Sequence, residues 1–205
     1  MYYKNYYESI SIGLFKTEYF IGQKIVDPGN FYAAIKQMLS EIKEKKSRIF
    51  FFGNGASSAF ANHMALDFTK NGKINSKSLS DSSMLTALAN DYSYDGAMTE
   101  FMKLEHVNSN DLVITISSSG NSSNVVNVLE YCVSNQIRSV TLSGLREDNF
   151  SKKIGNYAIF VPMKTYGIVE CIHQVVLHLM LDELMGITEW DRDEPQNMND
   201  SNFVI

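Results

Sequence analysis

The chain has 205 residues, of which 44% are hydrophobic and 20% are charged, and this composition excludes collagen-like, low-complexity and wholly disordered proteins. Its formal net charge of -5 argues against a general nucleic-acid-binding protein, which would need a basic face. No apolar run reaches the ~18 residues of a membrane span, and the start of the chain lacks the charged-then-apolar order of a signal peptide, so we expect a cytoplasmic protein without membrane partners.

Residues 1–46 have the apolar spacing of helices. From Ile10 to Ile25, apolar residues recur three and four positions apart, which predicts helix through this segment. Asp27-Pro28-Gly29-Asn30 interrupts the pattern, because proline disfavours helix in the residue before it and Asp or Asn can cap the next helix. A second helix is expected to follow, with an apolar face made of Phe31, Ala34, Ile35, Met38, Leu39 and Ile42.

This amino-terminal segment is rich in aromatic residues. It carries more apolar surface than one face of a sheet needs, which predicts a subunit interface. The alternative is that these helices only cover the core of their own chain. The residues concerned are Tyr2, Tyr3, Tyr6, Tyr7, Phe15, Tyr19 and Phe20.

From Arg48 onward, short apolar runs alternate with helical segments. The run at residues 49–52 stops at Gly53 and is typical of a strand buried on both faces. Strands that alternate with helices indicate crossover connections, so we expect an α/β fold: a three-layer αβα sandwich with a central parallel sheet of about five strands and N-terminal helices. The other expected strands are 76–79, 112–116, 139–142 and 157–161, and the expected helices are 57–70, 82–90, 121–135, 148–154 and 168–185.

These elements are expected to form a single domain over residues 1–186, followed by a C-terminal extension over residues 187–205. The extension is acidic and polar and shows no period, so we expect it to lie on the surface or to be partly disordered, with Trp190 as its packing residue. Cys132 and Cys171 each lie in an apolar periodic stretch, and we expect both to be reduced, buried thiols.

Two of the expected strand-to-helix junctions carry Gly, Ser and Asn. Glycine permits a positive φ, and hydroxyls beside free helix-start amides form a neutral cradle for a phosphate. Ligands of an open parallel sheet bind where its strands end, so both junctions are candidate binding loops; the alternative is two ordinary strand-to-helix turns. Neither matches a nucleotide fingerprint, because the P-loop pattern is absent and Ser58 stands where a third glycine would be. They are the glycine loop (residues 53–58) and the serine loop (residues 117–122).

Together, these residues resemble the sugar isomerase (SIS) domain, and in particular its phosphoheptose isomerase branch. The resemblance runs from Phe31 to Met185 and is carried by Gly-Asn-Gly-Ala-Ser at 53–57, His63 with Asp67, Asn90-Asp91, and Ser-Ser-Ser-Gly-Asn-Ser at 117–122. It implies a homotetramer with sites at subunit interfaces. It also implies that the phosphate of a sugar phosphate is bound by Ser117, Ser118, Ser119 and Ser122, and that the sugar contacts Asn54, Gly55, Ala56, Asp67, Asn90, Asp91 and Glu170.

The resemblance further implies a zinc site, made by His-x3-Glu on one helix and Gln-x7-His on the last long helix. In this chain His63 and His178 keep the histidine positions, Asp67 stands at the glutamate position, and Glu170 stands at the glutamine position. Gly167 and Ile168 stand where an Asp-Arg pair is expected. We expect a divalent metal, Zn2+, held by His63, Asp67, Glu170 and His178.

Helix geometry bears on these positions. His63 and Asp67 are four residues apart and share one helix face; the alternative for this pair is a hydrogen-bonded histidine and a solvated charge. Glu170 and His178 lie ~12 Å apart along a helix axis, so both reach one ion only with nearly extended side chains. His173 is closer to Glu170 and is either a competing ligand or a core histidine.

The resemblance implies a sugar-phosphate isomerase, most specifically one that interconverts sedoheptulose 7-phosphate and D-glycero-D-manno-heptose 7-phosphate. Moving a proton between adjacent carbons through an enediol requires a base, for which we expect Asp67, and an acid or relay, for which we expect His178, while the ion polarises the carbonyl. Glu170 is an alternative base. The alternative functions are an isomerase for another sugar phosphate and a non-catalytic SIS protein that binds a sugar phosphate or a replication initiator and regulates.

Overall fold

The computed structural model describes residues 1–187, and the expectations for residues 188–205, Trp190 among them, lie outside the described part of the chain. Its strands form one sheet in the order β2-β1-β7-β6-β5-β3-β4. The five strands from β7 to β4 run parallel, which confirms the expected sheet, and β1 adds an antiparallel pairing with both β7 and β2 at one edge. The strands are β1 (Glu18–Ile21), β2 (Lys24–Val26), β3 (Ile49–Gly53), β4 (Ser76–Ser78), β5 (Leu112–Ser117), β6 (Arg138–Gly144) and β7 (Tyr157–Val161).

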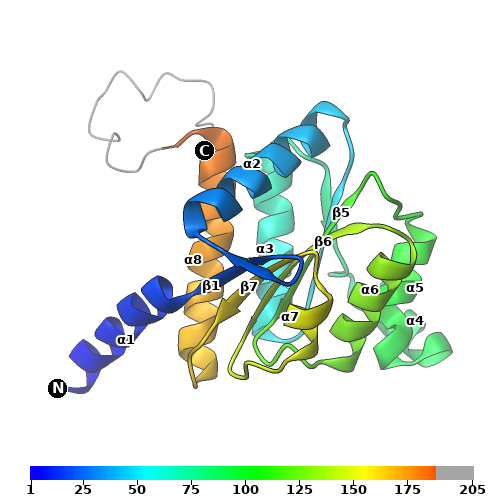
Figure 1. Ribbon diagram of the computed structural model, residues 1–205. Helices are drawn as coiled ribbons and strands as arrows, with labels where there is room; N and C mark the ends of the chain where they lie inside the picture. The colour runs from blue at the N-terminus through cyan, green and yellow to red at the C-terminus, as the bar shows by residue number, and fades with distance from the viewer. Residues whose placement is uncertain (188–205) are drawn as a thin grey trace.

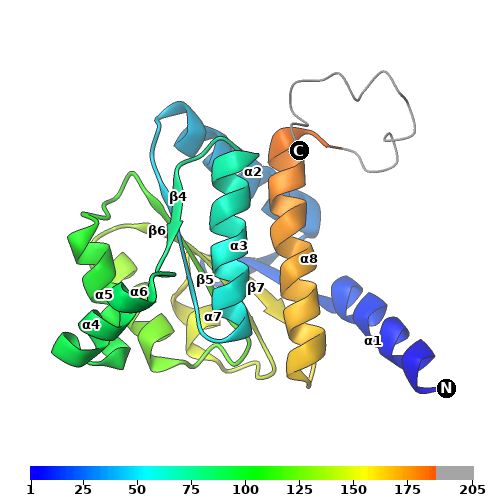
Figure 2. The ribbon, with the colours of Figure 1, turned by 180° about the vertical axis from the view of Figure 1, so that it is seen from behind.

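Helices cover both faces of this sheet and complete the three layers (Figure 1). One layer holds α2, α3 and α8, and Figure 2 shows α3 and α8 side by side. The other layer holds α4, α5, α6 and α7, while α1 reaches out from the body and contacts α8. The helices are α1 (Tyr2–Lys16), α2 (Pro28–Glu44), α3 (Ala56–Lys70), α4 (Ser82–Tyr92), α5 (Tyr94–Leu104), α6 (Ser123–Ser134), α7 (Phe150–Ile154) and α8 (Tyr166–Met185).

Successive residues of β3 face opposite layers, which explains why this run is apolar without a break. Ile49 and Phe51 pack with α2, α3 and α8, whereas Phe50 and Phe52 pack with α5 and α6. All four side chains are buried. The sheet is therefore enclosed on both sides, as parallel sheets usually are, and its ligands can approach only at an edge or a strand end.

Residues 18–26 depart from the expected helix, and that prediction is wrong. They form the hairpin of β1 and β2, in which Ile21 pairs with Lys24. Gly22 and Gln23 are left as a two-residue turn, and the φ of 58° at Gly22 suits the turns that join tight hairpins. The aromatic and β-branched residues of this segment also favour a strand.

Helix starts and stops follow the sequence more closely. The Asp27 carboxylate accepts a hydrogen bond from the Asn30 main-chain N–H at 3.0 Å and caps α2, with Pro28 in the first turn, as expected. α5 was not expected. Ser93 caps it, and its buried face consists of Ala97, Met98, Phe101 and Met102.

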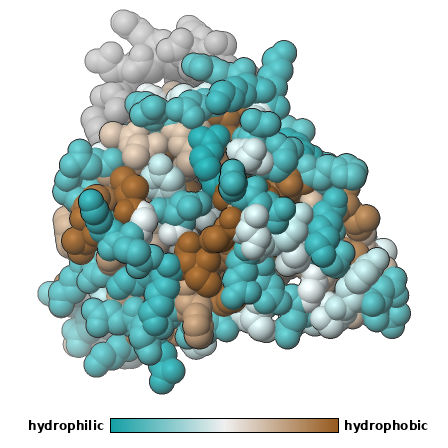
Figure 3. Space-filling model, turned by 45° about the vertical axis from the view of Figure 1, so that its right-hand side comes forward, coloured by the Kyte–Doolittle hydropathy of each residue, from teal (hydrophilic) through white to brown (hydrophobic). Residues whose placement is uncertain are grey.

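The two thiols differ in exposure. Cys132 is buried in α6, as expected, but Cys171 is exposed on α8, so the prediction for Cys171 is wrong. Its neighbours Ile172 and His173 face the core, which leaves position 171 on the outer side of the helix. Among the described helices, none has the length and apolar content to cross a membrane. On the face drawn in Figure 3, apolar residues gather in separate patches within a mostly hydrophilic surface.

Candidate active site

A crevice is expected between β3 and β5, because these neighbouring strands are followed by helices on opposite faces of the sheet. α3 follows β3 and packs in the layer of α8, whereas α6 follows β5 and packs in the layer of α5. Open α/β sheets bind ligands at such a reversal, at the carboxyl ends of the strands. The glycine loop follows the end of β3 and the serine loop follows the end of β5, so the two predicted loops are neighbours at this reversal.

The glycine loop turns the chain directly from β3 into α3. Gly55 is the N-cap of α3 and has a φ of 54°, a conformation that side-chain-bearing residues rarely adopt. At Gly53, a Cβ would lie 2.7 Å from the main chain of Ser57. The turn therefore needs both glycines, and it leaves the first N–H groups of α3, which begins at Ala56, just beyond the carboxyl end of β3.

Asn54 ties the two loops together. Its amide nitrogen donates to Asn124 Oδ1 at 2.8 Å, and its Oδ1 accepts from Asn124 Nδ2 at 2.9 Å. The same oxygen accepts from the Tyr94 hydroxyl at 3.0 Å. The structure therefore engages the predicted sugar contact Asn54 with Asn124 and Tyr94. Neither of these two residues was assigned a role from the sequence, although Asn124 closes the same strand-to-helix junction as the serine loop.

The serine loop is shaped by a close approach to the segment that precedes α7. Gly120 has a φ of 63°, and a Cβ there would overlap the side chain of the buried Asn149. Ser117 and Ser122 place their hydroxyl oxygens 3.4 Å apart, so they share one part of the loop. Ser118 Oγ is buried and has no hydrogen-bond partner among the described residues, so it can still bind a polar group.

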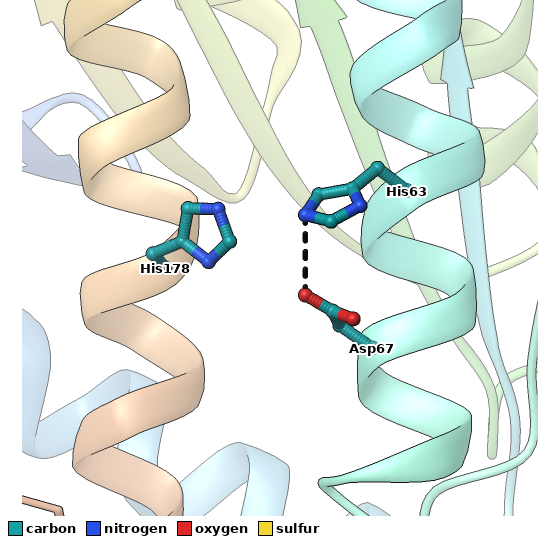
Figure 4. A group of neighbouring side chains, drawn as sticks. All are labelled: His63, Asp67 and His178. Carbon is teal, nitrogen blue, oxygen red and sulfur yellow. Dashed lines mark ion pairs between the residues drawn. The ribbon is translucent and has the colours of Figure 1, made fainter. Parts of the chain in front are cut away.

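His63, Asp67 and His178 meet between two helices (Figure 4). His63 and Asp67 project from α3 toward α8, which carries His178. His63 Nε2 lies 3.2 Å from Asp67 Oδ2, and one ligand atom from each of the three residues lies within 4.8 Å of the other two. The His63 side chain is 47% exposed and that of Asp67 is 17% exposed, so a solute can reach this cluster.

The remaining predicted ligand, Glu170, does not join this cluster. The residue beside His178 is Gln174, whose side-chain amide lies 2.7 Å from His178 Nε2. Gln174 was missed, although it precedes His178 by one helical turn and so shares its face. Its Oε1 is buried without a hydrogen-bond partner in the described part of the chain.

His173, the competing ligand, is a core histidine. It is fully buried, and its Nε2 lies 3.1 Å from the main-chain oxygen of Ser143. Burial lowers the pKa of His173 to about 4, because an imidazolium ion would lose its hydration there.

Asn90 and Asp91, the other predicted sugar contacts, lie near the end of α4. Both are exposed, and the Asn90 amide donates to Asp91 Oδ1 at 3.0 Å. The structure does not bring Asp91 into the cluster of His63, Asp67 and His178. Their predicted role in sugar binding stays a prediction.

The cluster has the chemistry of a divalent metal site. Two imidazoles and one carboxylate are a common ligand set of catalytic zinc, and a tetrahedral ion about 2.1 Å from its ligands holds them about 3.4 Å apart. The 3.2 Å between His63 and Asp67 and the 4.8 Å limit for all three residues are compatible with that arrangement. Gln174 places its amide nitrogen 2.7 Å from His178 Nε2, and its Oε1 is buried without a partner in the described part of the chain. The residues present therefore fit a divalent ion.

Comparisons with known proteins agree with this fold. The SIS domain model matches residues 27–144. A phosphoheptose isomerase of Helicobacter pylori (strain ATCC 700392 / 26695) is 33% identical over 158 residues, which are 73% of this chain and 81% of that protein.

Solved structures show the same fold. A phosphoheptose isomerase from Neisseria gonorrhoeae aligns with a TM-score of 0.69 at 24% identity, over 76% of this chain and 86% of that chain. One from Francisella tularensis aligns with a TM-score of 0.72 at 17% identity, over 90% of this chain and 96% of that chain. The chain belongs to the SIS domain family and, within it, to the phosphoheptose isomerase branch of sugar-phosphate isomerases.

Proposed function

We propose that this chain interconverts sedoheptulose 7-phosphate and D-glycero-D-manno-heptose 7-phosphate by proton transfer through an enediol. The observation that carries the proposal is the meeting of His63, Asp67 and His178, which brings a carboxylate and two imidazoles to one accessible point. The names of its relatives support the substrate class. In this proposal the serine loop holds the phosphate, so that binding energy from a remote group positions the reacting carbons.

Asp67 is the proposed base. Its carboxylate removes the proton from the carbon beside the carbonyl, and its Oδ2 lies 3.2 Å from His63 Nε2 within the cluster. His178 is the proposed acid or relay, because it brings the second imidazole to the cluster and histidine is the side chain that most often acts as general acid or base. Glu170 lies outside the cluster, which favours Asp67 over the alternative base.

We propose Zn2+ as the bound ion, with His63, Asp67 and His178 as ligands and the Gln174 amide oxygen, rather than Glu170, as a further donor. Imidazole nitrogen suits zinc. The Gln174 amide, whose nitrogen lies 2.7 Å from His178 Nε2, would have to turn over to bring its unpartnered Oε1 to the ion. When bound, such an ion would supply a Lewis acid that polarises the substrate carbonyl. The two Asp67 oxygens allow one to face the ion while the other takes the proton.

We also propose that the chain is a cytoplasmic homotetramer. The support is on α1, which packs on α8 but leaves large apolar side chains in water. Tyr2 is 83% exposed and Phe15 is 89% exposed, which is more than a helix covering only its own core would show.

The first test is exchange of the substrate's alpha hydrogen with deuterated water, measured together with metal content. Asp67→Asn should lower the exchange rate by about a hundredfold or more, because an amide cannot take the proton. Its amide oxygen can still face the ion, so bound metal should be weakened but present. Glu170→Gln is the matched control and should keep most of the exchange.

If Asp67→Asn exchanges the hydrogen as fast as the wild type, the general base is Glu170 instead of Asp67. Wild-type protein that holds no metal and catalyses no exchange on any of several ketose phosphates would favour the non-catalytic alternative instead.

A further inference from the structure

A hollow of about 400 Å3 is lined in part by the serine loop. Its lining comes from segments that follow β5, β6 and β7, three neighbouring strands that end at the same edge of the sheet. None of the predicted ligands of the metal cluster lines it. The lining residues are Ser119, Asn121, Leu145, Arg146, Lys164 and Tyr166.

The polar groups of this hollow are arranged to donate hydrogen bonds. Ser119 Oγ already accepts from the Asn121 main-chain N–H at 3.2 Å, so its own hydrogen remains to be donated. Asn121 Oδ1 accepts from the Phe150 main-chain N–H at 2.9 Å, which fixes the amide and leaves its NH2 group as the donor. Both side chains therefore have hydrogens free to donate to a ligand.

Its two cations lack ion-pair partners within residues 1–187. The other two arginines in that part of the chain are paired: Arg48 lies 2.7 Å from an Asp111 oxygen, and Arg138 lies 3.2 Å from a Glu41 oxygen. Among the described residues, no carboxylate oxygen lies within 4.0 Å of Arg146 or Lys164, and no acidic residue lines the hollow. Two uncompensated positive charges beside donor groups make a site for an anion.

The main chain around Arg146 is held in place. Arg146 N–H donates to the Gly144 oxygen at 2.7 Å, which closes a three-residue turn around Leu145 with its φ of 62°. The buried Asn149 amide donates to the Arg146 oxygen at 2.7 Å. The main chain of Arg146 is therefore already ordered, so less conformational entropy is lost when its side chain binds a ligand.

We propose that this hollow is a phosphate site, in which Arg146 and Lys164 supply the charge and Ser119 and Asn121 supply hydrogen bonds. A phosphate group has the charge and the acceptor oxygens that this lining lacks. It can belong to the sugar phosphate or to a second phosphorylated metabolite, and only the first source rests on the proposed isomerase function. Ser119 belongs to both the serine loop and the hollow, so the two sources are physically adjacent.

The test is calorimetric titration with inorganic phosphate. The Arg146→Ala/Lys164→Ala double variant should bind phosphate about tenfold more weakly than the wild type, since each exposed charge contributes only a few-fold. Added KCl should weaken binding in the wild type more than in the double variant, because salt screens the two charges. Lys36→Ala removes an exposed charge on α2 and is the matched control. Arg146→Lys, which keeps the charge, should retain most of the affinity.

Competition separates the two sources. If sedoheptulose 7-phosphate displaces inorganic phosphate and the double variant weakens both, the hollow holds the substrate's phosphate; if both bind together, it serves a second metabolite. Wild-type affinity for phosphate in the double variant, or no binding to the wild type, overturns the site. Absence of hydrogen exchange alongside intact phosphate binding would count against the isomerase proposal and leave this site standing.

Discussion

His173 is a buried histidine whose protonation is linked to folding. Its Nε2 faces the Ser143 carbonyl, and its Nδ1 has no partner in the described residues. Because burial lowers its pKa to about 4, from an ordinary value of 6.5, the folded protein keeps this ring neutral at a pH where the unfolded chain takes up a proton.

The stability that the neutral ring contributes should be complete above pH 6.5 and should be lost as the pH falls toward 4, a change of about 3 kcal/mol. In His173→Gln, the free energy of unfolding should therefore fall less between about pH 7 and pH 4.5 than in the wild type. Urea unfolding at both pH values measures this difference, with His106→Asn, at an exposed histidine, as the control. Parallel pH dependence in His173→Gln and the wild type would contradict the linkage.

The candidate site could be predicted from the sequence only where local spacing decides it. Helix periodicity placed His63 and Asp67 on one face, and the structure joins them. The meeting with His178 depends on how α3 and α8 pack, so it followed from the resemblance rather than from spacing. Glu170 lies two turns before His178, too far along the axis to join the cluster, whereas Gln174 lies one turn before it.

At the scale of elements, the serine loop depends on one glycine. Gly120→Ala would force a side chain into left-handed backbone, with a φ of 63°, and against the buried Asn149. We expect a loss of about 2–4 kcal/mol in the free energy of unfolding, from backbone strain plus overlap. Binding of sugar phosphate should weaken as well, because the loop must move.

Gly22→Ala is the control for this prediction. Gly22 has a similar φ of 58°, but a Cβ there would meet nothing within 4 Å. Urea unfolding should therefore show only the strain term, about 1–2 kcal/mol. Equal losses in both variants would mean that Asn149 gives way and that the close approach does not hold the loop.

The elements that the sequence predicted well are those whose burial is decided by their own pattern. The unbroken apolar run of β3 is buried on both faces, and the apolar stripe of α2 is buried on one. The β1 and β2 hairpin was missed because its aromatic residues also fit a helical spacing, although the Gly22-Gln23 turn between them is a hairpin signal. α5 was missed because Gly96 in its first turn weakens the helical pattern.

At the scale of the whole molecule, the exposed aromatic residues of α1 bear on the oligomeric state of the protein. Phe15→Glu places a charge on its most exposed aromatic position and should shift the proposed tetramer toward smaller species. Light scattering at micromolar concentration measures the mass. Phe150→Glu changes a 56% exposed phenylalanine on α7 and should leave the mass unchanged. A monomeric wild type would show that α1 covers only its own chain.

The position of the metal cluster also makes the stability of the folded protein depend on the supply of metal. His63 and Asp67 lie on α3, and His178 lies on α8, which enters the chain much later. An ion bound there would join two segments that are far apart in the sequence. The unfolded chain does not bring these three ligands together, so it would not form this site. Each tenfold rise in free ion above the dissociation constant would then add about 1.4 kcal/mol to the folded state. Scarcity of the ion would lower the amount of folded protein as well as its turnover.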